Sequence, residues 1–398
     1  MGVTKRIYEH EIRDIKSMWI SELKKVQEIL PKVYNENDII KLLKEFYPYE
    51  WKSVDFKYNY YKIKDKYLLN AGKKSRYKML EPDRLIKTLP LFKKMLTKEY
   101  KEKYSKTFDE EKLRYIRYKR EEMLKNRQSK IKRVDEKIEK ALSKTQRVTP
   151  IYLDKLIGLY ERKRTTQKDK VYILLELKKY YSEKIINFFL KVNDTEINYQ
   201  LRWEAFYHLQ SFNFNPRARR QKYMQVHTKN KKRKKYLKEV YAKEKFNIPL
   251  NPDELEYRIK NGREQQLKEF DFFISHSSKD GKAVQKLITY QNENGKNIFC
   301  DWINDSDYLK RNLLCKATLN VIELRLQQSK NLIFVESENS KNSVWCKYEL
   351  NYYSELDRPI YYITKEDIEN NNFNIRLLED KWFIDKNYKE EINFKQGE

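Results

Sequence analysis

The chain has 398 residues, of which 39% are hydrophobic and 14% aromatic, enough apolar material for two or three domains with packed cores. This composition excludes disorder for the bulk of the chain, and the seven glycines and nine prolines favour helices over a β-sandwich. The net charge of +27 is unevenly divided: residues 270–398 hold 18 basic and 21 acidic residues, which leaves 68 of the 86 basic and 38 of the 59 acidic residues to residues 1–269. This step in charge predicts a domain boundary near residue 270.

The apolar segments are all too short for an integral membrane protein. Runs such as residues 185–190 fall far below the roughly 18 apolar residues of a membrane-spanning helix. The N-terminus lacks the apolar core of a signal peptide, so we expect a cytoplasmic protein. Cys300, Cys315 and Cys346 are too scattered for a disulfide framework, and with the four histidines they show no metal-ligand spacing. We therefore expect no disulfide, no metal and no membrane association.

Residues 1–250 are predicted to form a basic, all-helical region. Thr107 and Glu110 have the spacing of a capping box. Apolar residues then recur at helical spacing until Pro150 ends the pattern. This pattern predicts one long, highly charged helix.

Shorter amphipathic helices are expected to follow. One covers residues 170–192, and another begins with a capping box at Asn193. Successive short helices of this kind resemble a HEAT-type helical repeat, on the spacing of Arg202, Ala205 and Leu209.

The most basic segment covers residues 217–238, before the acidic Glu239. Like charges at this density repel one another unless an anion neutralises them. Contacts with nucleic-acid phosphates would release counterions, and Tyr223 and Tyr236 are available to stack on bases. A solvated surface explains the same composition equally well. The cations are Arg217, Arg219, Arg220, Lys222, Lys229, Lys231, Lys232, Arg233, Lys234, Lys235 and Lys238.

Residues 270–398 change to strand periodicity, after a break at residues 251–269 that we interpret as a linker. Short apolar strands alternate with helices, which predicts βαβ units around a parallel sheet. Ligands of such sheets bind beyond the carboxyl ends of the strands. The expected strands are residues 271–275, 297–302, 331–335 and 359–363, with a further one at 382–384, and the expected helices are residues 281–290, 313–327 and 343–356.

Four motifs occur in order along this region. They are Phe-Phe-Ile-Ser-His-Ser-Ser-Lys-Asp at 272–280, Phe-Cys-Asp-Trp at 299–302, Ser-Lys-Asn-Leu-Ile-Phe-Val at 329–335 and Ser-Val-Trp-Cys-Lys-Tyr-Glu-Leu at 343–350. In order and spacing they resemble the Toll/interleukin-1 receptor (TIR) family, specifically its bacterial members. The resemblance implies a flavodoxin-like α/β fold for residues 270–398 and does not cover the first 265 residues. We expect the preceding all-α region to sense a trigger or to support assembly.

The resemblance also implies cleavage of the bond between nicotinamide and ribose in NAD, because many TIR domains catalyse this reaction. The family's catalytic glutamate lies four residues after a tryptophan, which maps onto Trp345 and Glu349. A spacing of four places both side chains on one helical face, where they converge on one ligand. A carboxylate at the mouth of a crevice can stabilise the positive ribose that forms as the bond breaks. The alternative is that Trp345 packs on the sheet and Glu349 is a solvated helix residue.

Further ligand contacts are expected at the ends of the first two strands. Ser275, Ser277 and Ser278 belong to the turn after the first strand, whose hydroxyl and N–H groups suit a pyrophosphate. Asp301 and Trp302 end the second strand and point into the same crevice, where Asp301 either binds ribose or caps the loop. We expect NAD as the substrate, with no separate cofactor.

Taken with these patterns, the resemblance implies a bacterial immune protein whose TIR enzyme hydrolyses or cyclises NAD in defence against phage. The resemblance implies self-association, with the loop at residues 303–312 completing a neighbour's site. A second hypothesis is a non-enzymatic TIR scaffold, or a host-directed effector, that binds other TIR domains. A third is a nucleic-acid-binding protein with an inactive TIR domain.

Overall fold

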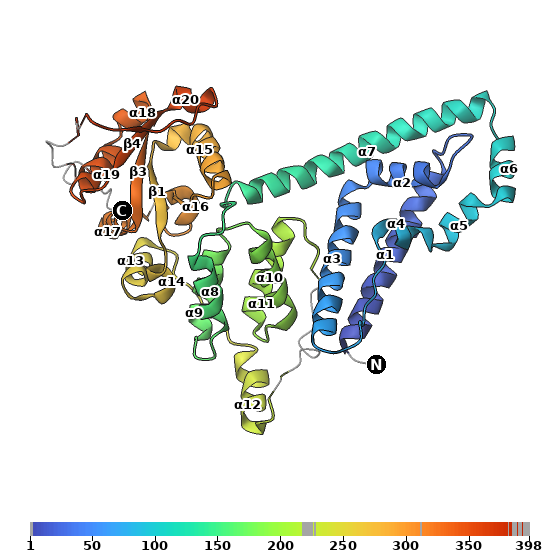
Figure 1. The fold of residues 1–398 in the computed structure, drawn as a ribbon, viewed down its shortest axis with the longest axis horizontal. Coiled ribbons are helices and arrows are strands. Elements are labelled where there is room, and N and C mark those ends of the chain that lie inside the picture. The colour runs from blue at the N-terminus through green and yellow to red at the C-terminus, as the bar shows by residue number, and fades with distance from the viewer. Residues whose placement is uncertain are drawn as a thin grey trace. The chain divides into compact units, whose positions relative to one another are not determined.

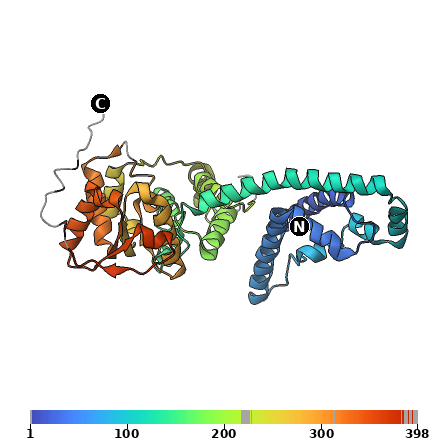
Figure 2. The same cartoon turned by 90° about the horizontal axis from the view of Figure 1, so that it is seen from above.

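The computed structural model divides the chain into two compact units, Met1–Lys137 and Ile138–Glu398. It describes residues 3–216, 226, 228–310, 313–380, 382, 383, 388 and 392. In this described part, no helix combines the length and the apolar character that crossing a membrane requires. Helix α7 (Glu110–Leu142) begins in the first unit and ends in the second, and Figure 2 shows it as one continuous helix. The long charged helix predicted from the sequence is therefore confirmed.

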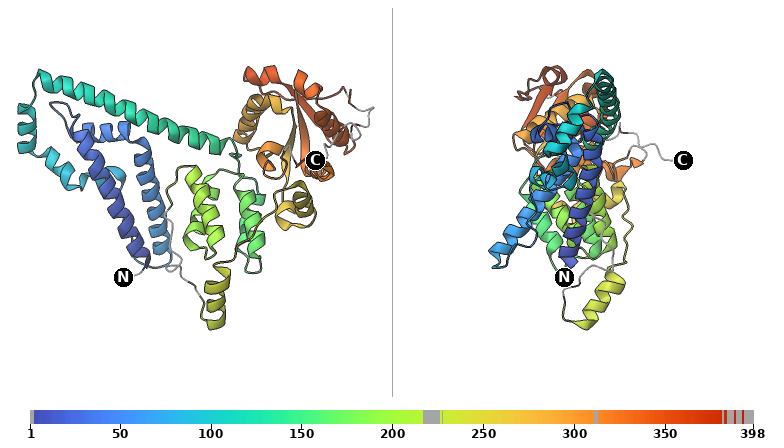
Figure 3. Two further views of the ribbon diagram at one scale, coloured as in Figure 1. Left: turned by 180° about the vertical axis from the view of Figure 1, so that it is seen from behind. Right: turned by 90° about the vertical axis from the view of Figure 1, so that its right-hand side faces the viewer.

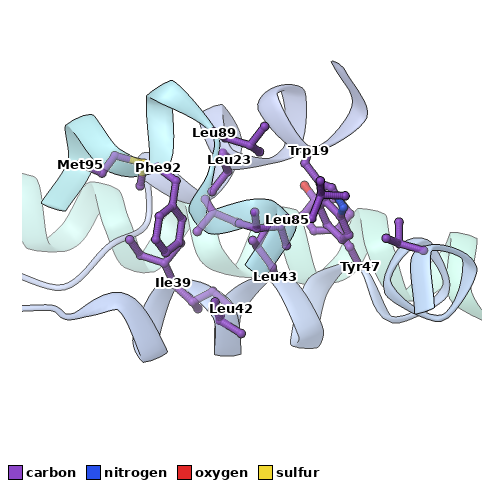
Figure 4. Close-up of a cluster of buried hydrophobic side chains, with 14 of the residues drawn as sticks. Trp19, Leu23, Ile39, Leu42, Leu43, Tyr47, Leu85, Leu89, Phe92 and Met95 are labelled. Carbon is purple, nitrogen blue, oxygen red and sulfur yellow. The ribbon is translucent and has the colours of Figure 1, made fainter. Parts of the chain in front are cut away.

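The first unit is built from helices around one apolar core. Asn35 caps the second helix through a capping box with Asp38. Trp19, Leu43 and Phe92 come from three different helices and meet in the core (Figure 4). The helices before α7 are α1 (Val3–Gln27), α2 (Glu36–Phe46), α3 (Pro48–Asn70), α4 (Pro82–Lys87), α5 (Pro90–Leu96) and α6 (Lys98–Lys106).

The start of α7 differs from the predicted capping box. The Thr107 hydroxyl donates a hydrogen bond backwards to the Tyr104 carbonyl, at 2.7 Å, and so completes α6. Asp109 accepts a hydrogen bond from the Lys112 N–H, also at 2.7 Å, and caps α7. Thr107 was the wrong choice because Asp109 satisfies an N–H group of the first turn directly.

The second unit begins with short helices that form hairpins (Figures 1 and 3). The helix predicted at residues 170–192 is in fact two helices, because Ser182 accepts a hydrogen bond from the Ile185 N–H and starts a new one. The predicted cap at Asn193 is also wrong, since Asn198 caps the next helix. The elements are α8 (Tyr152–Glu161), α9 (Gln167–Leu177), α10 (Glu183–Thr195), α11 (Tyr199–Ser211), α12 (Lys231–Tyr236), the π-helix η2 (Leu237–Tyr241), α13 (Pro252–Asn261) and α14 (Arg263–Gln266).

A five-stranded sheet follows, in the order β2-β1-β3-β4-β5. The first four of these strands are parallel, and β5 pairs antiparallel with β4. The strands are β1 (Phe270–Ser275), β2 (Ile298–Phe299), β3 (Ser329–Glu336), β4 (Ile360–Thr364) and β5 (Arg376–Leu377). The helical elements are η3 (Ser278–Asp280), α15 (Gly281–Glu293), α16 (Asp301–Asn304), α17 (Lys316–Gln327), α18 (Glu338–Lys341), α19 (Val344–Ser354) and α20 (Lys365–Glu369).

The sheet lies between two layers of helices. Phe272 and Ile274 of β1 pack against α15 and α20. Phe273, between them in the sequence, belongs to the opposite cluster, with residues of α17 and α19. Because side chains alternate along a strand, Ser275 shares the face of Phe273. This alternation turns the end of β1 towards α19.

The predicted α/β fold with a parallel sheet around the first strand is confirmed. Two predicted strands were placed wrongly. Asp301 and Trp302 belong to α16 and not to the second strand, which is only two residues long. The last strand lies at Arg376–Leu377, whereas Trp382 and Phe383 form a turn and residue 384 lies outside the described residues.

Buried charged groups join the helical hairpins to the sheet. Five residues, which we call the ionic cluster, are each at most 6% exposed. Arg325 of α17 bonds Asp305 through its Nε, at 2.7 Å, and its Nη2, at 3.1 Å. Lys179, which follows α9, pairs with Glu176 at 2.9 Å and with Asp305 at 3.5 Å. The members are Glu176, Lys179, Lys268, Asp305 and Arg325.

The outer edge of β2 is covered by two amide side chains. Gln146, four residues after the end of α7, accepts a hydrogen bond from the Ile298 N–H at 3.0 Å and donates one to the Ile298 carbonyl. Asn304 accepts a hydrogen bond from the Cys300 N–H at 2.9 Å. Gln146 also donates to Asn304 at 3.3 Å. The segment after α7 is therefore bonded directly to the strand that leads to Asp301.

The division at Lys137 differs from the predicted boundaries of 1–250, 251–269 and 270–398. The segment expected as a linker contains α13 and α14, and Leu255 and Ile259 of α13 pack against Tyr308 and Val321. The change in net charge near residue 270 reflects amino-acid composition alone. The division at Lys137 reflects which residues pack together.

Candidate functional site

A cavity of about 490 Å³ lies at the carboxyl ends of β1 and β2, beside the start of α19. This is the edge at which ligands of parallel sheets bind, and the volume is within the range of about 300–1,000 Å³ of small-molecule sites. The lining includes residues that the sequence analysis singled out, namely Ser277, Ser278, Asp301, Trp302, Trp345 and Glu349.

Helix α19 places Glu349 opposite the end of β1. Ser343 starts the helix by accepting a hydrogen bond from the Cys346 N–H. One turn later, the Glu349 carboxyl reaches the fully buried Ser275, whose hydroxyl donates to Oε2 at 2.6 Å. Ser275 is therefore behind the cavity wall and fixes the carboxyl group, whereas Glu349 itself lines the cavity.

Glu349 is partly buried and lines the cavity. Burial raises its pKa to about 8, the hydrogen bond from Ser275 acts in the opposite direction, and the nearby Asp301 charge raises it further. In the described part of the chain, no lysine or arginine side chain bonds to this carboxyl group. Glu349 is therefore largely protonated at neutral pH in the free chain.

The turn after β1 is held rigidly on its outer side. Ser277 accepts a hydrogen bond from the Lys279 N–H at 3.4 Å. The buried Asp280 accepts hydrogen bonds from Ser337 at 2.6 Å and from Asn339 at 3.1 Å, in the segment after β3. The turn and the first residue of α15 thus present hydroxyl groups and a helix N-terminus to the cavity, a combination that favours an anionic group.

Asp301 and Trp302 form the opposite wall, and both are exposed. His276 lies between the two strand ends. Its Nδ1 is 3.1 Å from the Ile274 carbonyl, so Nδ1 carries the proton and Nε2 faces the Asp301 carboxylate at 4.0 Å. The Cys300 thiol donates a weak hydrogen bond to Oδ1 of Asp301 at 3.9 Å, and the exposed carboxylate can accept further hydrogen bonds, as ribose hydroxyls would supply.

Potential metal ligands gather here, which the sequence spacing did not indicate. Ligand atoms of His276, Cys300 and Asp301 lie within 4.8 Å of one another. Burial, however, raises the pKa of the Cys300 thiol well above its usual value. The group offers three possible ligand atoms, one of them on the fully buried Cys300, and the expected absence of a metal stays a prediction.

The rest of the lining includes a group of mostly apolar residues that were not predicted as part of the site. Leu309, Leu314 and Ile322 contribute, together with Thr318. In the sequence, the residues of α17 have the pattern of ordinary core positions. The sequence therefore did not indicate which of them line a cavity and which are packed in the core. Together with Trp345, the three aliphatic side chains form an apolar part of the cavity lining, which contrasts with the polar turn after β1.

The predicted nucleic-acid segment is only partly described. Arg217, Arg219, Arg220, Lys222 and Tyr223 lie outside the described residues. The described remainder is mostly helical, and the cations of α12 are exposed. Nucleic-acid binding stays a prediction.

Fold and cavity together define a flavodoxin-like α/β domain that carries a buried carboxyl group at its ligand-binding edge. The family model described as "Thoeris protein ThsB, TIR-like domain" matches residues 273–370. No solved structure matches the chain at a significant level.

Known relatives extend the match to most of the chain. The putative cyclic ADP-D-ribose synthase TIR2 of Cytobacillus dafuensis is 35% identical over 370 residues, covering 92% of this chain and 93% of the relative. The probable 3' cyclic ADP-D-ribose synthase ThsB' of Bacillus cereus (strain MSX-D12) is 33% identical over 106 residues, 27% of this chain and 53% of that protein. Toll-like receptor 2 of Mus musculus is 32% identical over 83 residues, 21% of this chain and 10% of the receptor. The chain belongs to the bacterial TIR-domain family that includes TIR2.

Proposed function

We propose that this chain is an NAD-cleaving TIR enzyme of antiphage defence. The observation that carries the proposal is a partly buried carboxyl group, Glu349, in a cavity at the ligand-binding edge of the sheet. The names of the relatives TIR2 and ThsB' support the same chemistry, because a cyclic ADP-ribose synthase must release nicotinamide from NAD.

The reaction needs a negative charge beside the ribose. As the bond between C1 of the ribose and the nicotinamide nitrogen breaks, positive charge develops on the ribose, and nicotinamide leaves as a neutral molecule. The Glu349 carboxylate stabilises that charge. The nicotinamide ring of bound NAD is itself positive, so binding favours the ionised form of Glu349 and lowers its pKa. Ser275 holds the carboxyl group in place during this change.

The remaining lining fits the rest of NAD. Ser277, Ser278 and the N-terminus of α15 suit the pyrophosphate, and Asp301 suits ribose hydroxyls. Trp302 and Trp345 offer flat apolar surfaces for the rings. Self-association of the TIR part, as the family resemblance implies, is part of this proposal, because Trp302 and Asp301 are exposed at the rim.

Cyclisation is the proposed outcome rather than hydrolysis. Both begin with the same bond cleavage and differ in whether water or another part of the same nucleotide attacks C1 of the ribose. Leu309, Leu314 and Ile322, together with the two indoles, limit the room for water. Mass spectrometry distinguishes the products, because a cyclic ADP-ribose is lighter than ADP-ribose by one water.

The test is replacement of Glu349 in the full chain. Glu349→Gln and Glu349→Ala should lower the rate of nicotinamide release by a factor of about 10² to 10⁴, since they remove a charge needed in the transition state. Glu355→Gln, at the exposed end of α19, is the matched control and should retain activity. Equal turnover by wild type and Glu349→Gln would reject the catalytic role. A wild type that releases no nicotinamide at high concentration, with or without a trigger, would favour the scaffold hypothesis.

A further inference from the structure

A second charged cavity lies within the helical part of the second unit. It has a volume of about 600 Å³ and is formed by the connection between α8 and α9 and by the junction of α13 and α14. It shares no lining residue with the Glu349 cavity. Four arginines line it: Arg162, Arg164, Arg258 and Arg263.

One of these arginines is a structural residue. Arg258 donates to Glu264 from its Nε at 2.7 Å and pairs with Asp169 through its Nη2 at 3.1 Å. Its guanidinium also stacks 4.1 Å from the centre of the Tyr172 ring. The two acidic groups of the cavity are therefore both engaged by Arg258.

The other three arginines have no such partner. Arg162, Arg164 and Arg263 are exposed, and within the described residues none of their side chains makes a hydrogen bond or an ion pair. Three positive charges thus face one concavity whose only carboxylates are already paired. Their mutual repulsion would be relieved by a bound anion.

The lining of this cavity and of its neighbour indicates what kind of anion would fit. Gly262 lets the backbone pass close to Arg258, since a Cβ there would lie 2.7 Å from the Arg258 carbonyl oxygen. An adjoining cavity of about 310 Å³ shares Leu159, Arg162 and Arg263 and adds Lys155. Cations therefore extend over both cavities, as linked phosphates require.

The chemistry of these cations favours phosphate. Guanidinium groups bind phosphate oxygens through two parallel hydrogen bonds. Among the residues that the structure describes, neither cavity is lined by an aromatic ring on which a nucleobase would stack. We propose that Arg162, Arg164 and Arg263 form a binding site for a small molecule carrying two or more linked phosphate groups.

Other cavities fit this role less well. The cavity beside β5, about 660 Å³, contains cations and carboxylates that neutralise one another, such as Lys341 and Glu336. The arginine cavity differs because its unpaired groups are all positive.

Titration of the full chain with pyrophosphate at low salt tests the proposal. The variant Arg162→Gln/Arg263→Gln removes two unpaired cations of the site. Arg117→Gln/Arg133→Gln removes two exposed cations of α7 and is the control for net charge. We expect the site variant to bind pyrophosphate about tenfold more weakly or worse, because charged hydrogen bonds are lost, and the control to bind as wild type does.

A second measurement separates loss of binding from loss of folding. The substituted arginines are exposed, so both variants should unfold at the temperature of the wild type without ligand. Pyrophosphate should raise the unfolding temperature of wild type and control but not of the site variant. Arg164→Gln alone should show the same loss in smaller measure.

Four results would overturn the proposal, the last of them obtained with DNA. The first is equal pyrophosphate affinity in site variant and control, and the second is no saturable binding to wild type. The third is binding that NAD displaces and both variants retain, which would place pyrophosphate in the Glu349 cavity. A short DNA duplex is titrated in parallel, and if only its binding is lost in the site variant, the ligand is a nucleic-acid backbone and the small-molecule proposal fails.

Discussion

Two groups of carboxyl side chains lie inside the second unit, and their pKa values move in opposite directions. Glu349 borders the cavity, and burial raises its pKa to about 8. Glu176 belongs to the ionic cluster, and although burial acts on it in the same direction, Lys179 and Lys268 outweigh that effect and lower its pKa to about 2. Asp305 is held well below its usual pKa, since Arg325 and Lys179 outweigh burial.

The difference lies in the neighbours of each carboxyl group. Glu349 has a hydroxyl donor, Ser275, and a second acid, Asp301, beside it. Asp305 has a guanidinium with two hydrogen bonds. A carboxylate that is already neutralised has little to offer a developing positive charge, whereas one without a cation gains most when that charge appears. Within one unit, the first arrangement suits catalysis and the second holds elements together.

Breaking the ionic cluster should have the largest effect on stability. Arg325→Leu leaves the buried Asp305 without its two strongest hydrogen bonds, and we expect a loss of about 3–5 kcal/mol in the free energy of unfolding, measured with urea. Arg325→Leu/Asp305→Leu removes both charges and should recover a large part of this loss. A single variant as stable as wild type would show that the cluster does not hold the hairpins to the sheet.

The pH dependence of NAD cleavage tests the role of Glu349, the carboxyl group that has no cation beside it. If Glu349 must be ionised in the free enzyme, kcat/KM should rise about tenfold per pH unit up to about pH 8 and level off above it. The residual activity of Glu349→Gln should lack this rise. A profile that is flat from pH 6 to 9 would mean that the carboxyl group is ionised throughout, contrary to its raised pKa.

The same raised pKa predicts a gain in stability from Glu349→Gln. The folded chain holds a proton on Glu349 up to about pH 8, whereas the unfolded chain releases it near 4.5. Stability therefore falls as the pH rises through this window. The glutamine variant avoids that penalty and should be more stable than wild type above pH 8, by on the order of 1–3 kcal/mol. The advantage should vanish below pH 4.5 in urea unfolding measured across pH.

The smallest effect is expected from Gln146→Ala. It leaves the N–H and carbonyl groups of Ile298 without partners and should cost about 1–2 kcal/mol. Because β2 leads to Asp301 and Trp302, the KM for NAD should also rise. Gln128→Ala, at an exposed position of α7, is the control. An unchanged KM in Gln146→Ala would show that the wall of the cavity keeps its place without this residue.

The sequence predicted those features that depend on local periodicity. The order of strands and helices in residues 270–398 follows from alternating apolar runs, and the spacing of Trp345 and Glu349 placed both on one face of α19. The raised pKa of Glu349 was not predictable, because it depends first on burial and then on the Asp301 charge, and both arise only in the fold, where the hydrogen bond from Ser275 acts against them.

The ionic cluster could not be predicted from the sequence either, because its members approach one another only in the fold. Glu176, Lys268 and Asp305 are far apart in the sequence, and each reads as an ordinary charged surface residue. The predicted start of a helix was wrong where two nearby residues could both cap it, as with Thr107 and Asp109. A local pattern lists the capping residues that are available, whereas packing decides which of them is used.

The amides of Gln146 and Asn304 also limit the ways in which the proposed self-association could occur. The outer edge of a sheet normally offers unpaired N–H and C=O groups to a strand from another molecule. Here the outward groups of Ile298 and the N–H of Cys300 are already bonded within the chain. A second copy that extended the sheet at β2 would first have to displace both side chains. Gln146 and Asn304 thus block the addition of a strand at this edge, so the self-association that we propose would have to use helices, loops or the other edge.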